Sequence, residues 1–235
     1  MDSLHNQCLL AYDIAPITLS LPGSIDLPSA PPLFCSSWVV PRLLGAASIV
    51  LGYILPRIIE PATYVSSVVI DDQRIHKKEL IRKAILAVTS TATIIKLSQF
   101  LQTHDVVNLG GHPIMLNAKW SLFLMAASEF LQWILLDPTP VALVAATISA
   151  FGVSMSDLPF VASGFWHYIP QSANYLPLSG DLFQQGGIAD KVASTILGDS
   201  YHGLALSSIT GPCYFAVTMD AIALSRYFNQ SSETE

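Results

Sequence analysis

The sequence predicts an all-α fold, namely a polytopic membrane helix bundle with about five transmembrane helices. Of its 235 residues, 51% are hydrophobic and only 12% are charged, whereas soluble proteins carry about 25% charged residues. The mean hydropathy is +0.50. Apolar runs of roughly 17 to 25 residues, the length that crosses the hydrocarbon core of a bilayer, recur along the chain. The chain is therefore expected to be a multi-pass membrane protein.

Composition and motifs exclude several other classes of protein. With 11 Lys and Arg against 17 Asp and Glu, the chain lacks the basic surface that nucleic acid requires. Cys8, Cys35 and Cys213 do not have the spacing of zinc ligands, so they are interpreted as packed thiols. The six histidines form no metal-binding pair on a helix, and the sequence contains no phosphate loop, dinucleotide fingerprint or nucleophile elbow. We predict no metal site, no cofactor and no nucleic-acid partner.

Residues 1–36 are predicted to be a non-spanning N-terminal segment. They contain no Lys or Arg, so they lack the basic start of a signal peptide and are expected to be retained. Proline cannot continue a helical hydrogen-bond ladder. This segment holds five prolines, at Pro16, Pro22, Pro28, Pro31 and Pro32.

Residues 37–228 are predicted to form the membrane helix bundle, followed by a C-terminal tail over 229–235. The five spans are expected at about 37–59, 84–101, 120–136, 141–156 and 203–227. In the first span, small residues suited to close helix packing in lipid form a stripe. They are Gly45, Ala46, Ala47, Ser48 and Gly52.

The fourth predicted span leaves two alternatives open. Its apolar run is short, so the helix either continues through Ser156 or breaks at Asp157 and re-enters the membrane over 157–168. Trp166 and Tyr168 are typical of an interfacial aromatic belt. In both cases residues 170–202 form an extended polar segment.

Loop charges orient this arrangement. Basic residues concentrate in cytoplasmic loops of membrane proteins. The segment between the first two spans, counted together with Arg57 at the end of the first span, holds six of the eleven basic residues: Arg57, Arg74, Lys77, Lys78, Arg82 and Lys83. Five crossings then place the N-terminal segment and the long polar segment on the other side, and Asp137 and Arg226 on the cytoplasmic side.

Two acidic residues stand out on the third span. Asp137 follows the run 120–136 and precedes Pro138, so it lies at the C-terminal end of a helix, where the helix dipole does not favour an anion. Glu129 lies within the span, where a charge costs about 2.5–3.5 kcal/mol on insertion scales. A buried ion pair or a neutral carboxyl explains Glu129 structurally, and a ligand or proton site explains it functionally.

Three short patches, in the same order, resemble the INSIG (insulin-induced gene) family of endoplasmic reticulum membrane proteins. The first patch is Trp38-Val39-Val40-Pro41 followed by Gly45-Ala46-Ala47-Ser48, Gly52 and Pro56. The second is Trp133 followed four residues later by Asp137. The third is Gly211-Pro212-Cys213 at the start of the last span. Family members usually have six spans; this sequence has no counterpart of the first, and its long polar segment is similar to that of fungal members.

The resemblance implies a non-enzymatic adaptor of the endoplasmic reticulum that binds sterol or another lipid. It also implies membrane partners with sterol-sensing domains, such as HMG-CoA reductase, and control of sterol or isoprenoid synthesis. Asp137, with Trp133, is then the expected partner contact. The implied lipid site is lined by Trp120, Leu124, Ser128 and Glu129. Helical spacing puts the first three on one stripe, which is also typical of ordinary packing.

The alternative is a small membrane enzyme, of the isomerase or cyclase kind, acting on an apolar lipid or isoprenoid substrate. Glu129 and Asp220 are the intramembrane carboxylates that would move protons in such an enzyme. This reading requires both carboxylates to face one cavity within hydrogen-bond reach.

Overall fold

The computed structural model describes residues 10–14, 16–19, 34–59, 73–104, 106–109, 112–115, 118–170, 172–180, 183–184 and 186–232. Most of these residues are helical, as predicted. The short strands among them were not predicted. Most of the N-terminal segment, the connection 60–72 and the last three residues of the C-terminal tail lie outside the described part of the chain.

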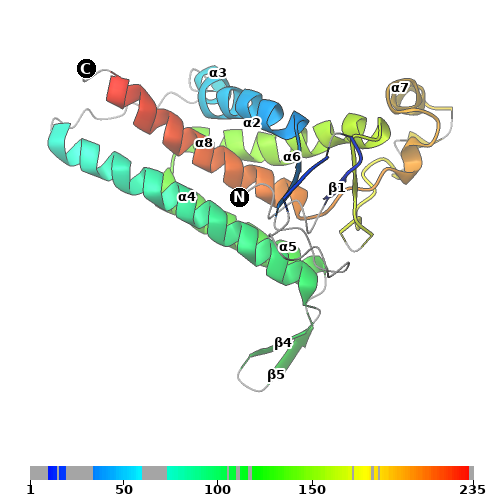
Figure 1. Ribbon diagram of the computed structural model, residues 1–235, viewed down its shortest axis with the longest axis horizontal. Coiled ribbons are helices and arrows are strands. Elements are labelled where there is room, and N and C mark those ends of the chain that lie inside the picture. Colours follow the sequence, from blue (N-terminus) through cyan, green and yellow to red (C-terminus); the bar gives the residue numbers. More distant parts are fainter. Residues whose placement is uncertain are drawn as a thin grey trace.

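Five long helical segments form the body of the molecule (Figure 1). The first is continuous and consists of α2 (Val39–Ile49), a π-helical turn η2 (Val50–Ile54) and α3 (Leu55–Ile59). The others are α4 (Gln73–Thr103), α5 (Ala118–Leu136), α6 (Pro140–Ala162) and α8 (Thr210–Ser232). A shorter helix, α7 (Ile188–Leu197), and a 3₁₀ turn η5 (Tyr201–Gly203) lie between α6 and α8.

Three antiparallel strand pairs complete the described fold. Strand β1 (Leu10–Tyr12) pairs with β6 (Trp166–Tyr168), so the chain before the bundle is joined to the end of α6. Strands β2 (Pro16–Leu19) and β3 (Phe34–Ser37) pair just before α2. Strands β4 (Val106–Leu109) and β5 (His112–Met115) form a hairpin between α4 and α5.

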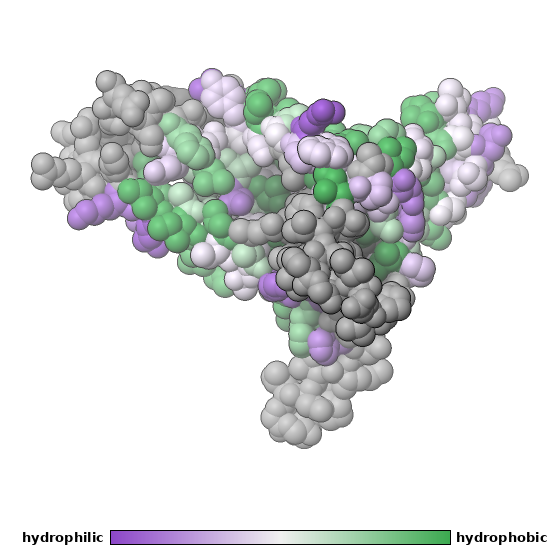
Figure 2. Space-filling view, viewed as in Figure 1, coloured by the Kyte–Doolittle hydropathy of each residue, from purple (hydrophilic) through white to green (hydrophobic). Residues whose placement is uncertain are grey.

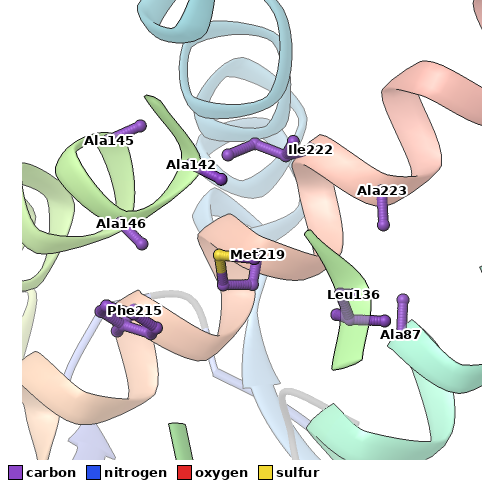
Figure 3. Packing of buried hydrophobic residues seen from close by; sticks show 9 residues of the cluster. All are labelled: Ala87, Leu136, Ala142, Ala145, Ala146, Phe215, Met219, Ile222 and Ala223. Atoms are coloured by element: carbon purple, nitrogen blue, oxygen red, sulfur yellow. The ribbon is translucent and has the colours of Figure 1, made fainter. Parts of the chain in front are cut away.

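Helix α8 occupies the centre of the bundle. It contacts α4, α5, α6 and η2, and no residue from Thr210 to Ser225 is exposed. Figure 3 shows its side chains Phe215, Met219 and Ile222 among small residues of α6. The alanines of α6 that allow this close packing are Ala142, Ala145 and Ala146.

The polarity of the bundle is that of a membrane protein. Glu129, Gln132 and Thr218 are buried, whereas Phe123, Phe151 and many other large apolar side chains are exposed. Figure 2 shows hydrophobic residues spread over the helices on the face in view. A bilayer accounts for this, because lipid solvates apolar side chains and polar groups must find partners inside the protein.

Three helices are long and apolar enough to cross a membrane: Val39–Ile59, Lys78–Gln102 and Pro140–Ala162. Helices α5 and α8 are not among them; α5 contains Lys119, Glu129 and Gln132, and α8 contains Asp220 and Arg226. The protein is therefore a membrane protein with at least three such helices in the part of the chain that the structure describes.

Helix boundaries differ from the predicted ones in three places. Helix α4 begins at Gln73 rather than at residue 84, so part of the predicted basic loop is helical. Helix α8 begins at Thr210 rather than at residue 203. Helix α6 continues through Asp157 to Ala162, with Pro159 inside it, so of the two alternatives for the fourth span the break at Asp157 is wrong.

The members of the predicted small-residue stripe differ in burial, with Ala47 partly buried. Gly45, Ala46 and Ser48 are exposed. Gly52, in the π-helical turn, is buried, and a Cβ atom built there would lie 2.7 Å from the carbonyl oxygen of Ala221 in α8. Only glycine permits this close approach of η2 to α8.

Candidate functional site

The turn between α5 and α6 is closed by the two residues of the Trp133–Asp137 motif. The Asp137 amide donates to the Trp133 carbonyl at 3.0 Å, which completes the last turn of α5. The Trp133 indole Nε1–H donates to the Thr139 carbonyl at 3.1 Å. Thr139 in turn caps α6 by accepting from the Ala142 amide at 3.3 Å. The motif therefore sets the geometry with which the chain reverses.

The Asp137 carboxylate is buried, with only 3% of the residue exposed. Its Oδ2 atom lies 2.6 Å from Nη1 of Arg226 on α8, whose side chain is 47% exposed. The contact joins the two charges without a well-aligned hydrogen bond to Oδ2. Arg226 compensates much of the cost of burying an anion at this helix end. The sequence predicted both residues at the same end of the bundle, but not their pairing.

Glu129 lies on the inner face of α5 and is 7% exposed. It lies close enough to Cys213 on α8 to interact with it electrostatically, and Ser98 of α4 forms a hydrogen bond with the same thiol. One carboxyl oxygen of Glu129 is buried without a hydrogen-bond partner. Glu129 is thus enclosed between α4, α5 and α8, as expected for an ionisable residue within a span.

Gln132, one turn further along α5, links the same three helices. Its Nε2 atom donates to Thr91 Oγ1 at 3.0 Å and to Ser90 Oγ at 3.1 Å, both on α4. A longer contact of 3.5 Å reaches the Ala216 carbonyl on α8. Together, Glu129 and Gln132 give α5 a polar inner seam, of which the sequence predicts only Glu129.

Asp220 lies on α8, seven residues beyond Cys213, and its Oδ1 atom is buried without a hydrogen-bond partner. Because Glu129 neighbours Cys213 and an α-helix rises about 1.5 Å per residue, the two carboxyls lie at levels about 10 Å apart along α8. The structure therefore does not bring Glu129 and Asp220 together within hydrogen-bond reach.

The remaining residues of the predicted lipid site lie toward the outside. Trp120 is 50% exposed and Leu124 is 36% exposed. Ser128 is half-buried, and its hydroxyl donates to the Met125 carbonyl of its own helix at 2.7 Å. Of the predicted set, Glu129 alone faces the bundle interior. Binding of a lipid to these residues stays a prediction.

A second polar cluster, which the sequence does not predict, lies near the other end of α8. Asp157 of α6 is buried and accepts hydrogen bonds from Tyr168 Oη at 2.7 Å and Tyr214 Oη at 3.0 Å. Thr210 Oγ1 donates to the Tyr168 hydroxyl at 3.1 Å. Burial, with the nearby Asp157 carboxylate, raises the pKa of Tyr168 far above its usual value, so its hydroxyl stays a proton donor. These contacts join α6, β6 and α8.

A small apolar core next to this cluster gives the predicted polar segment a fixed structure. Leu158 of α6 packs there with Tyr168, Leu178, Ala193 of α7, Tyr201 and Leu206. Tyr201 Oη also donates to Asp190 Oδ1 at 2.7 Å. The apolar residues were spaced too irregularly along the sequence to indicate this core.

Among the described residues, no three His, Cys, Asp or Glu side chains lie together as metal ligands would. Comparisons of the chain with family models, with curated proteins and with solved structures found no match.

Proposed function

We propose that the chain is a lipid-responsive, non-enzymatic membrane adaptor of the endoplasmic reticulum, similar to the INSIG family. In this proposal the chain crosses the membrane five times, with the Asp137 end of the bundle in the cytoplasm. It binds a sterol or another lipid and a partner with a sterol-sensing domain, such as HMG-CoA reductase. Its activity is then the regulation of sterol or isoprenoid synthesis through that partner.

The observation that carries the proposal is the two-sided character of α5. Its inner face packs on α4 and α8. Its outer face presents large apolar side chains to the surroundings and ends at the Trp133–Asp137 turn. These exposed residues are Trp120, Leu122, Phe123, Leu124, Phe130, Leu131, Ile134 and Leu135. An apolar helix face of this kind lies in the hydrocarbon of the bilayer, where a partner helix can pack on it, and the polar turn beside it can supply the polar contact that helix association in lipid uses.

The separation of Glu129 and Asp220 favours an adaptor over the membrane enzyme. An enzyme that moves a proton across a substrate needs both carboxyls within reach of the same molecule. Here Glu129 belongs to the α4–α5–α8 seam near Cys213, and Asp220 lies about two turns further along α8.

Affinity purification of the tagged protein from detergent-solubilised membranes, with and without added sterol, tests the proposal. We expect the wild-type chain to recover a sterol-sensing partner in a sterol-dependent amount, and Asp137→Ala to recover much less. If the wild type and Asp137→Ala recover equal amounts of the partner, Asp137 does not have the proposed role in partner binding. If the amount of partner recovered is the same with and without sterol in every sample, the proposed response to lipid is wrong.

Arg226→Ala is the matched control, because it breaks the same ion pair and leaves the Asp137 carboxylate in place. If Asp137 itself contacts the partner, Arg226→Ala retains binding. If the ion pair matters only for the fold, Arg226→Ala loses the partner at least as much as Asp137→Ala does. Size-exclusion profiles of the two proteins show whether each is folded.

A further inference from the structure

Helix α7 carries an apolar stripe on its outer surface. Ile188, Val192 and Ile196 follow one another at intervals of four residues, so they lie on one face of the helix. They are 85%, 53% and 66% exposed, respectively. The opposite side contributes the buried Ala193 and the partly buried Leu197 to the core around Leu158. Lys191 and Thr195, which lie off the stripe, are exposed as well, so α7 presents both polar and apolar side chains to its surroundings. Three large apolar side chains gathered on one exposed helix face indicate a second apolar neighbour.

The position of α7 identifies this neighbour. Its buried side packs near the end of α6, against the cluster that contains Leu158 and Val161. Helix α6 has 23 residues and is therefore about 34 Å long, slightly more than the hydrocarbon thickness of about 30 Å. Its last turn, and α7 with it, therefore lies at the level of a membrane boundary.

The direction of the α7 axis also supports a position at the membrane surface. In Figure 1, α7 is viewed nearly along its own axis, whereas α6 and α8 extend across the page. Helix α7 thus lies across the direction of the bundle, as a helix in the plane of the bilayer surface does. The nearby outer side of α6 is apolar as well, with Phe151 and Met155 exposed, so the lipid-facing surface continues toward α7.

We propose that α7 is an interfacial helix whose stripe of Ile188, Val192 and Ile196 inserts into the bilayer surface beside the end of α6. Its polar side carries one acid and one base, Asp190 and Lys191, so no net positive charge attracts anionic lipid. Insertion therefore depends on apolar burial alone. Helix α7 would fix how deep this end of the bundle lies in the membrane.

The test places the photoreactive residue benzoylphenylalanine at position 192 in the full chain, reconstituted in phosphatidylcholine vesicles. Lys191 is exposed and lies about 100° around α7 from Val192, off the stripe, so benzoylphenylalanine at position 191 is the matched control. After illumination, mass spectrometry is expected to detect about fivefold or more phospholipid adduct at position 192 than at position 191. The yield should stay the same when part of the lipid is phosphatidylglycerol.

Three outcomes would overturn the proposal. Equal adduct yields at positions 191 and 192 would mean that the stripe is not in lipid. Crosslinking of position 192 to a second copy of the chain would make it a protein contact. A yield that rises strongly with anionic lipid would contradict insertion by apolar burial alone. Benzoylphenylalanine at position 196, also on the exposed stripe, repeats the measurement if the first variant folds poorly.

Discussion

Asp137 and Arg226 form an ion pair of 2.6 Å that joins the α5–α6 turn to the last part of α8. The two partners are not equivalent, since the Asp137 side chain is 4% exposed and that of Arg226 is 47% exposed. Loss of Arg226 leaves a buried anion without its counter-charge. Loss of the Asp137 charge leaves a cation that water can solvate.

This asymmetry predicts unequal effects of the two substitutions on stability. Arg226→Ala should lower the free energy of unfolding by about 1–3 kcal/mol, less than a fully buried pair because Arg226 is half-exposed. Asp137→Asn should lower the free energy of unfolding by less than Arg226→Ala does, and the double variant should be more stable than Arg226→Ala alone. Thermal unfolding of the three variants in detergent measures these differences in stability. A larger loss for Asp137→Asn than for Arg226→Ala would contradict the assignment.

A second prediction concerns the close approach of η2 to α8. Gly52→Ala would place a Cβ atom 2.7 Å from the Ala221 carbonyl oxygen and 2.9 Å from its carbon, which are backbone atoms and cannot rotate away. We expect a loss of about 1–3 kcal/mol, typical of overpacking. Gly45→Ala is the control, because nothing lies within 4 Å of its Cβ position and alanine favours helix by up to about 1 kcal/mol. Similar melting temperatures for the two variants would show that η2 does not pack as described.

A third prediction concerns the Asp157 cluster. Asp157→Ala removes the acceptor of the Tyr168 and Tyr214 hydroxyls, whereas Tyr168 keeps its contact with Thr210. We expect faster hydrogen exchange in β6 and in residues 172–206, with the bundle helices unchanged, because this cluster joins that region to α6 and α8. Ser156→Ala, at the exposed neighbouring position, should leave exchange as in the wild type. Equal protection in both variants would refute the joining role.

Apolar run length located the helical bundle well, because the spacing of hydrophobic residues along the chain is a local property. The orientation of α5 was harder to predict. Helical spacing grouped Trp120, Leu124 and Ser128 on one face, but it does not say which face is inside. In lipid the apolar face of a helix turns outward. The polar residues Ser121, Glu129 and Gln132 therefore indicate the buried face of α5 better than the apolar residues do.

Contacts between distant segments could not be predicted from local patterns. The pairing of Asp137 with Arg226 and of Asp157 with Tyr214 depends on how α8 lies against α5 and α6. The strand pair of β1 with β6 likewise joins two segments that are separated in the sequence by four of the five long helical segments. Each of these pairs is specified only once the helices are packed.

The last prediction concerns the acid sensitivity of α7. The Gly186 amide donates to Asp190 Oδ2 at 2.8 Å, and this hydrogen bond, with that of Tyr201, lowers the pKa of Asp190 below its ordinary value of 3.8. A carboxylate with a lowered pKa stabilises the fold above its ordinary pKa, and this contribution is lost as the pH falls from 3.8 through the lower folded value. The difference in melting temperature between the wild type and Asp190→Asn should therefore be constant above about pH 5 and shrink below pH 3.8. Taking this difference cancels the titration of other groups. A difference that grows as the pH falls would show that the folded protein favours the protonated acid, contrary to the hydrogen bonds that Asp190 accepts.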